Sequence, residues 1–175
     1  MSMKTILAGN KAVLIILNGL KYSEQLLKSL KFFSGKKVCY ISFNKTCAYI
    51  KQTLKNSKID VSKMVFVDVI SRSIISAPTM LNDCYFVSSP AALTELSMVL
   101  DKLLAQKFEY VLFDSLGNML IYEKKQFVEQ FILRFINKAR EKEGNTIVGY
   151  ASSADEQKSF INEIGLFFDK VIDLN

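Results

Sequence analysis

Histidine and tryptophan are both absent from the 175 residues of this chain. Without an imidazole group, the chain cannot build a Ser-His or Cys-His nucleophile, a histidine general base or a histidine-ligated zinc site. Acid–base chemistry would have to come from carboxylates, lysines, tyrosines or cysteines. The absence of histidine therefore excludes the commonest catalytic arrangements from the start.

Cysteine, proline and glycine are scarce, at three, two and seven residues. Cys39, Cys47 and Cys84 form no C-x-x-C pair, and a sparse, odd set of thiols is typical of a reducing compartment. Half of the residues are hydrophobic, which excludes a disordered chain, a collagen and a disulfide scaffold. The apolar run Ala12–Leu17 is too short for a bilayer, which needs about 20 residues. We expect a cytoplasmic protein with one domain over residues 1–175 and no membrane span.

Arginine is rare as well. Arg72, Arg134 and Arg140 are the three arginines, so lysine accounts for most of the basic residues behind the formal net charge of +6. Phosphate recognition favours arginine, because a guanidinium group binds bidentately. The lysines are scattered along the sequence, for example at 36–37, 51, 55, 58, 63 and 124–125. Two interpretations stay open: a solvated lysine-rich surface, or a face that binds nucleic acid.

Short apolar runs alternate with longer stretches of helical spacing. The short runs predict strands at residues 13–17, 38–43, 64–70, 84–88, 110–114, 147–150 and 170–174. Helices are predicted at 21–33, 46–55, 90–106, 123–142 and 153–165, with Ser89 as the N-cap of the third. Residues 71–83 contain Pro78 and lack periodicity, which predicts a loop with room for a short helical turn. The alternation predicts an α/β fold: a three-layer α/β/α sandwich around a mostly parallel sheet of about seven strands.

Polar residues follow the predicted strands at the edge where open parallel sheets bind ligands. They include Asn18-Gly19, Asn44-Lys45 and Asp114-Ser115. Asp114 ends a buried apolar strand, a placement that holds a magnesium-bound water in nucleoside triphosphatases. A structural interpretation is also open, in which Asp114 caps the next turn and Asn18-Gly19 forms an ordinary strand-to-helix turn.

Three stretches carry a resemblance to a known family. Residues 33–43 read Phe-Ser-Gly-Lys-Lys-Val-Cys-Tyr-Ile-Ser-Phe, residues 110–116 read Tyr-Val-Leu-Phe-Asp-Ser-Leu, and residues 168–174 read Phe-Asp-Lys-Val-Ile-Asp-Leu. Together with the element order from Ala12 to Leu174, they resemble the RecA/KaiC-like branch of the P-loop ATPases, which occurs in archaea and bacteria. The first looks like the segment leading into the family's second strand, the second like its Walker B strand, and the third like its final strand. The resemblance implies a RecA-like sheet.

The loop after the first strand departs from this family. An active member carries G-x-x-x-x-G-K-[S/T] there, whose glycine N–H groups and lysine hold phosphate while the hydroxyl binds magnesium. Counted from Gly19, the second glycine, the lysine and the hydroxyl become Glu24, Gln25 and Leu26. Lys21 and Ser23 are present, but at the wrong spacing. The comparison with the family therefore implies a degenerate Walker A motif.

A second departure follows Ser42-Phe43. KaiC-like relatives carry one or two glutamates there that polarise the attacking water, whereas this chain has Asn44-Lys45. With the phosphate cradle and the general base both missing, we expect no catalytic residue, no cofactor and no metal. What remains is a vestigial pocket of Asn18, Gly19, Lys21, Ser23, Asn44, Asp114 and Ser115.

Three functions are compatible with these residues. The first is a non-catalytic RecA/KaiC-like domain, a pseudo-ATPase that acts as a regulatory or scaffolding protein-interaction module. Family members commonly form rings or bind related subunits, so the resemblance implies self-association or a protein partner. An exposed cluster among Phe32-Phe33, Phe127/Phe131/Phe135 and Phe167-Phe168 would mark such an interface.

The second function is ATP-independent nucleic-acid binding, which requires the lysines to converge on one face with aromatic rings between them. In that case Arg72, in the 71–83 segment, is a candidate contact. The third is divergent nucleotide or small-molecule binding through Asn18, Asn44, Asp114 and Ser115. The lysine- and isoleucine-rich usage is consistent with an AT-rich, archaeal genome.

Overall fold

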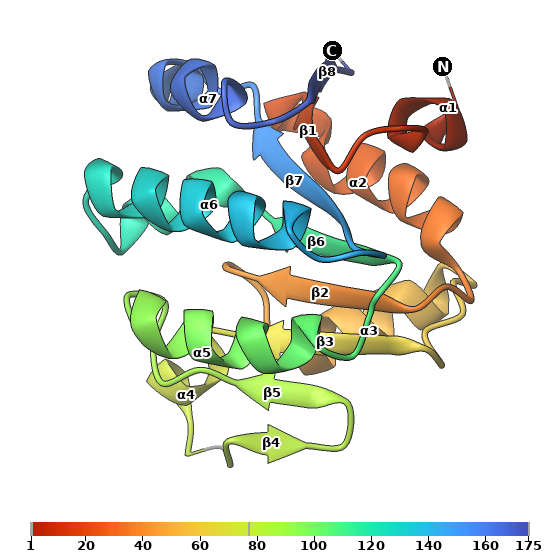
Figure 1. The fold of residues 1–175 in the computed structure, drawn as a ribbon. Helices are drawn as coiled ribbons and strands as arrows, with labels where there is room; N and C mark the ends of the chain where they lie inside the picture. The colour runs from red at the N-terminus through yellow and green to blue at the C-terminus, as the bar shows by residue number, and fades with distance from the viewer. Residues whose placement is uncertain (1, 77, 175) are drawn as a thin grey trace.

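The computed structural model describes residues 2–76 and 78–174. Their strands form one sheet in the order β4-β5-β3-β2-β6-β7-β1-β8, parallel except for β4 (Figure 1). The strands are β1 (Ala12–Leu17), β2 (Val38–Ser42), β3 (Met64–Asp68), β4 (Met80–Leu81), β5 (Cys84–Phe86), β6 (Tyr110–Asp114), β7 (Thr146–Ser152) and β8 (Lys170–Asp173). The α-helices are α1 (Met3–Leu7), α2 (Tyr22–Leu30), α3 (Cys47–Asn56), α4 (Ser71–Ile74), α5 (Leu93–Leu104), α6 (Lys125–Arg140) and α7 (Lys158–Gly165).

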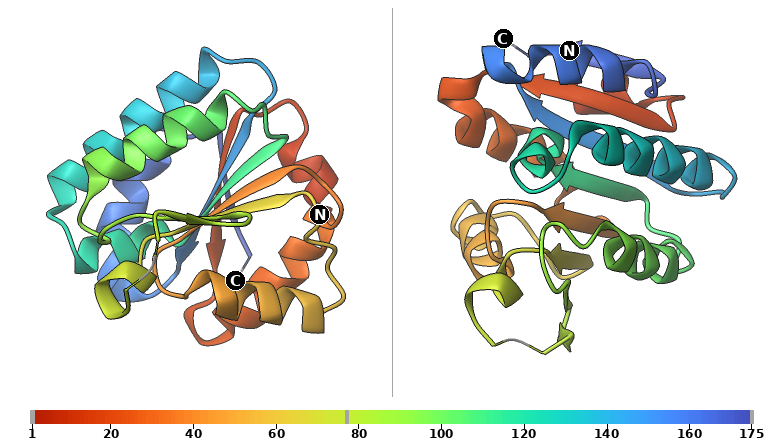
Figure 2. Two further views of the ribbon diagram at one scale, coloured as in Figure 1. Left: turned by 90° about the horizontal axis from the view of Figure 1, so that it is seen from below. Right: turned by 90° about the vertical axis from the view of Figure 1, so that its left-hand side faces the viewer.

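Helices cover both faces of the sheet, which confirms the predicted three layers (Figure 2). One buried cluster joins α1, α2 and α3 to one face, and a second joins α5, α6 and α7 to the other. Since both faces are covered, β1 and β2 are apolar on both sides, and their side chains are almost all buried. The parallel pairing follows the expected alternation of strand and helix.

The sheet has eight strands, where about seven were expected. The additional strand, β4, lies in the segment 71–83 that the sequence predicts as a loop. Its two residues pair antiparallel with β5 at the edge of the sheet. Two residues are too few to show a strand period, so the pattern could not reveal it. The short helical turn allowed for in this segment is present as α4.

The predicted start of the third long helix is wrong. Ser89 was expected to be its N-cap, but α5 begins at Leu93, after Ala92. Residues 89–92 form a turn instead, in which the Ala92 N–H donates to the Ser89 carbonyl. The Glu95 carboxylate accepts hydrogen bonds from the backbone N–H and the hydroxyl of Ser88, and so holds this turn against the helix.

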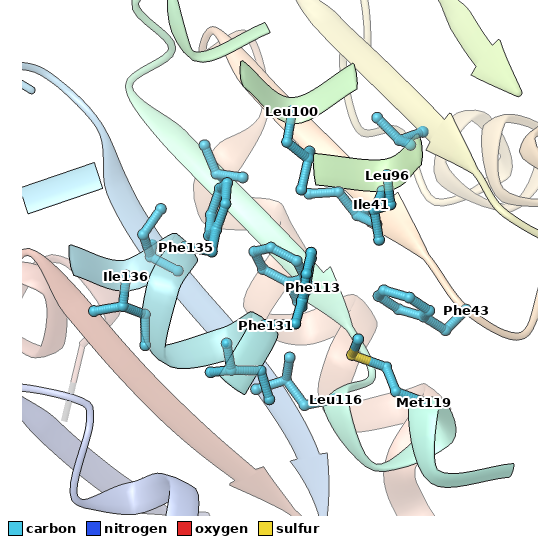
Figure 3. Close-up of a cluster of buried hydrophobic side chains, with 14 of the residues drawn as sticks. Ile41, Phe43, Leu96, Leu100, Phe113, Leu116, Met119, Phe131, Phe135 and Ile136 are labelled. Carbon is cyan, nitrogen blue, oxygen red and sulfur yellow. The ribbon is translucent and has the colours of Figure 1, made fainter. Parts of the chain in front are cut away.

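The core beneath α5 and α6 is aromatic and well packed (Figure 3). Phe113 of β6 meets Phe135 edge to face at 5.1 Å between ring centroids and stacks with Phe43 at 6.4 Å. Gly149 in β7 lies directly under this layer, because a Cβ built there would come within 2.6 Å of a Leu116 methyl group. These contacts fix β6, which carries Asp114, in the middle of the sheet.

Candidate functional site

Asp114 is the last residue of β6 and lies at the edge where the parallel strands end. Its neighbour across the sheet is Ser42, the last residue of β2, and the N–H of Phe43 donates to the Asp114 carbonyl at 2.9 Å. The peptide bond from Asp114 to Ser115 is cis. Both residues are buried, with 1% and 3% of their surface exposed. Asp114 therefore lies at the end of its strand, as the sequence predicts, and its carboxyl group is enclosed.

Two tyrosine hydroxyls donate hydrogen bonds to the Asp114 carboxyl group. The hydroxyl of Tyr22 donates to Oδ1 at 2.7 Å, and that of Tyr40 donates to Oδ2 at 2.5 Å. Tyr22 is the first residue of α2 and Tyr40 lies in the middle of β2. The carboxyl group is therefore held between the helix that follows β1 and the strand next to its own.

Burial raises the pKa of Asp114 above its usual value, while the hydrogen bonds from Tyr40 and Tyr22 and the charge of Lys45 act in the opposite direction. Burial is also the largest cause that raises the pKa of Tyr22 and of Tyr40, and the neighbouring Asp114 adds to it. Because both phenols keep their protons over a wide pH range, they remain hydrogen-bond donors to this carboxyl group.

The turn after β1 forms the 3-10 helix η1 (Gly19–Lys21). Asn18 satisfies two of its N–H groups: its Oδ1 accepts from Leu20 at 3.1 Å, and its carbonyl accepts from Lys21 at 3.1 Å. Gly19 packs closely against β7, because a Cβ there would lie 3.2 Å from the Ser152 hydroxyl. The Leu20 and Lys21 N–H groups are thus used within the turn itself.

Gln25 closes the same turn from α2. Its Oε1 accepts from the Asn18 N–H at 2.7 Å, and its Nε2 donates to the Leu174 carbonyl at 2.9 Å. One side chain therefore links the end of β1 to the chain beyond β8. Both polar atoms of the Gln25 amide are thus committed to backbone groups.

In the loop after β2, Ser42 and Lys45 are hydrogen-bonded to each other. The Ser42 hydroxyl donates to the Lys45 carbonyl at 2.7 Å and accepts from the Lys45 N–H at 3.2 Å. The Asn44 side chain is exposed, and the Lys45 ammonium group lies over the Tyr49 ring at 5.6 Å. Thr46 then caps α3 by accepting from the Tyr49 N–H.

A cavity of about 150 Å³ adjoins Asp114 between α2 and α3. Of the predicted residues, Ser23 and Asp114 line it, whereas Asn18, Gly19, Lys21, Asn44 and Ser115 do not. Much of its remaining wall is aliphatic, from Leu26, Leu27, Leu30, Ile50 and Leu54. Ligand sites commonly measure about 300–1,000 Å³, so this space is small for a nucleoside triphosphate.

Sequence reasoning missed the tyrosines. Tyr22 falls in the predicted helix 21–33 and Tyr40 in the predicted strand 38–43, and neither was singled out as a partner of Asp114. A third phenol, Tyr150, is fully buried in β7 and shares a 2.8 Å hydrogen bond with the Ser29 hydroxyl. The available signal was their chemistry, because buried tyrosine needs a partner for its hydroxyl.

Asp68, at the end of β3, is a second buried carboxylate that the sequence analysis did not single out. Its Oδ1 accepts from the N–H groups of Ile70 and Ser71, and its Oδ2 from the N–H of Cys47 and the Ser71 hydroxyl. These bonds end the strand and cap the start of α3.

Within residues 2–76 and 78–174, no three acidic or cysteine side chains gather as a metal site would require. No helix of the described chain is long and apolar enough to cross a membrane.

No protein-family model matches the chain, and no curated protein matches it. Solved structures do match. The KaiC-like protein PH0186 of the hyperthermophilic archaeon Pyrococcus horikoshii superposes with a TM-score of 0.63 and 10% identity, over 99% of this chain and 77% of that one. The flagellar accessory protein FlaH of Methanocaldococcus jannaschii gives 0.59 and 10%, over 98% and 75%. At 10% identity these matches show the fold and nothing more: the chain has the RecA/KaiC-like α/β fold.

Proposed function

We propose that this chain is a non-catalytic RecA/KaiC-like domain with a degenerate Walker A motif that works as a regulatory or scaffolding protein-interaction module. The observation that carries the proposal is the pair of hydrogen bonds that the Asp114 carboxyl group accepts. Both of its carboxyl oxygens already accept hydrogen bonds from Tyr22 and Tyr40. In a working site this carboxylate would face a magnesium-bound water instead.

Displacing the phenols would be costly. Tyr40 and Asp114 are buried and Tyr22 is half-buried, and a buried polar group left without a partner costs about 1–3 kcal/mol. Burial also favours the neutral form of Asp114 by raising its pKa, and a neutral acid is a poor ligand for a hard cation. Both effects oppose the binding of a metal–nucleotide complex.

The turn after β1 supports the same proposal. A phosphate cradle presents several free backbone N–H groups, but those of Leu20 and Lys21 are bonded to Asn18. The Leu20 side chain that follows Gly19 is fully exposed.

The surface over α5 and α6 supports a role in protein contacts. A groove of about 800 Å³ runs between these helices. Met98 and Phe127 line it with 59% and 46% of their surface exposed, while Phe131 and Phe135 are almost fully buried at its base. Phe127 is thus an exposed aromatic residue from the triad that the sequence singled out. Exposed apolar side chains in a groove are typical of surfaces that bind other proteins.

A nucleotide-binding and turnover assay tests the proposal. Thermal unfolding is followed with millimolar ATP or GTP and magnesium, and phosphate release is measured in the same buffer. A ligand at 100 times its Kd would add about 2.7 kcal/mol of stability. We expect no stabilisation and no turnover above that of an Asp114→Ala control. Stabilisation or turnover that is present in the wild type and lost in this control would overturn the proposal.

A further inference from the structure

Lysines that are scattered in the sequence meet at the edge where the parallel strands begin. Parallel strands start at one side of a sheet, so the residues before them form a row. The backbone bonds show the row directly: the Lys63 carbonyl accepts from Val38, the Lys37 carbonyl from Glu109, and the Lys11 carbonyl from Ile147. We call this row the strand-start edge: Lys63 before β3, Lys36 and Lys37 before β2, Lys107 before β6, and Lys11 before β1. It lies opposite the arrowheads of β2 and β7 in Figure 1.

The strand-start edge carries net positive charge. Lys11, Lys37, Lys63 and Lys107 are exposed, and none of the lysines of the row forms an ion pair among the described residues. Acidic groups at this edge are fewer, but they include Asp60 beside Lys63, and Glu141 and Glu143 before β7, so the excess of positive charge is modest. The Glu109 carboxylate accepts from the Lys37 N–H, and Asp169 is paired with Arg140 at 2.6 Å. The row therefore attracts an anionic partner.

The aromatic residues beside the row are not free to stack on bases. Phe32, Phe33 and Tyr110 pack edge to face on one another, with ring centroids 5.0–5.8 Å apart. The Lys36 ammonium group lies over the Phe32 ring at 4.9 Å. Single-stranded nucleic acid is bound through stacking platforms and through arginine, and the guanidinium at this edge, Arg140, is already paired. Lysine without free rings or free arginine favours carboxylates of a protein over a nucleic acid.

We propose that the strand-start edge binds a glutamate- and aspartate-rich segment of a partner protein. This inference rests on the proposed function and names the chemistry of its partner. The row from β3 to β1 crosses four strand spacings, which makes it roughly 19 Å long. An extended peptide of about six residues spans that length. The lysines supply point charges for its carboxylates, and the lysine stems pack along its backbone.

The test uses a fluorescein-labelled peptide of about seven residues that alternates glutamate and serine, a length slightly above that of the row. Its binding to the full chain is measured by anisotropy at about 50 mM and about 250 mM salt, because screening distinguishes charge pairing from apolar contact. The variant is Lys11→Gln/Lys36→Gln/Lys63→Gln. The matched control, Lys21→Gln/Lys45→Gln/Lys124→Gln, removes the same charge at the other end of the strands. Urea unfolding shows that both variants are folded.

We expect the edge variant to bind the peptide about tenfold more weakly than the control, since it loses three exposed charge pairs that each contribute a small part of the affinity. Binding should also fall at the higher salt concentration. Equal affinities for the two variants, or no binding at low salt, would overturn the proposal. A single-stranded oligonucleotide that binds more tightly than the peptide and loses affinity in the edge variant would also overturn it, in favour of a nucleic-acid surface. Since nucleotide binding is read in a separate assay, failure here leaves that test of the proposed function intact.

Discussion

The hydroxyl of Tyr22 donates a 2.7 Å hydrogen bond to Oδ1 of Asp114, a residue 92 positions further along the chain. This bond joins the first residue of α2 to the last residue of β6 and brings a phenol to the strand end. The segment that follows β1 is thereby fastened to the strand that resembles a Walker B strand. Occupation of Asp114 by side chains of its own chain is the basis of the proposed function.

Removal of either phenol hydroxyl should destabilise the fold. Tyr22→Phe and Tyr40→Phe each leave one carboxyl oxygen of Asp114 without its donor. We expect the free energy of unfolding to fall by about 1–3 kcal/mol for each, with the larger loss at Tyr40, which is more deeply buried. Urea denaturation followed by circular dichroism measures both.

Tyr49→Phe is the matched control for these variants. Tyr49 is 57% exposed, so its loss of a hydroxyl should change stability by no more than about 0.5 kcal/mol. If Tyr22→Phe and Tyr40→Phe were as stable as Tyr49→Phe, the phenols would not be holding Asp114 in the way the geometry indicates.

Asp114 should make stability depend on pH. Burial raises its pKa in the folded state, so the native protein binds this proton more tightly than the unfolded chain does. Its contribution is complete below the unfolded pKa, about 3.9, and is lost as the pH rises through the higher native value. Asp114→Asn cannot ionise and lacks this dependence.

Comparison of the wild type with Asp114→Asn separates the titration of Asp114 from that of the other carboxyl groups. We expect the unfolding free energy of the wild type minus that of Asp114→Asn to decrease as the pH rises from about 4 to about 7. Urea titrations at each pH give the difference. An increase with pH would mean that the folded protein stabilises the ionised carboxylate, which is the state required for metal binding.

Gly149 should not tolerate a side chain. A Cβ at this position in β7 would meet a Leu116 methyl carbon at 2.6 Å and the Phe168 ring at 3.1 Å. Gly149→Ala is expected to cost about 1–3 kcal/mol because the core above the sheet is overpacked. Gly165→Ala, whose Cβ would meet its neighbour at an ordinary 3.5 Å, is the control and should be nearly neutral. Equal unfolding midpoints for the two variants would contradict the packing.

The three cysteines should react slowly with a thiol reagent in the native protein. Cys39, Cys47 and Cys84 are buried and free, with at most 5% of their surface exposed. Burial also raises the pKa of Cys39, which lowers its reactive thiolate fraction further. We expect modification by Ellman's reagent to follow unfolding as urea is added. Fast stoichiometric labelling in native buffer would show that a thiol is accessible.

The strands were predictable because the seven longer ones are buried on both faces or bounded by turn residues. Their ends were less so: the run beginning at Met64 was predicted to reach residue 70, but β3 stops at Asp68, whose carboxylate binds the next backbone N–H groups. Sequence periodicity cannot show such a side-chain cap. The missed α1 and β4 are short, so neither shows a full repeat of its pattern.

The candidate site was predictable in part. Asp114 was singled out by its position after an apolar strand, and it does lie at the strand ends. Its partners were not predictable, because the bonds from Tyr22 and Tyr40 join residues 92 and 74 positions apart. The helical pattern of apolar residues predicts only that Tyr22 packs against the core. In the structure its ring does so, and its hydroxyl also donates a hydrogen bond to Asp114. The lysine row was hidden for the same reason, since it exists only once the sheet has formed.

The most direct measurement is a titration of the ¹⁵N-labelled protein with magnesium and ATP at millimolar concentration, read at the backbone amides of residues 19–22. Because the N–H groups of Leu20 and Lys21 are bonded to Asn18, and Tyr22 is bonded to Asp114, a closed site predicts that these signals stay in place. Saturable shifts of these amides, with parallel shifts at Asp114, would show a nucleotide in the crevice and contradict the closed site on which the proposed function rests.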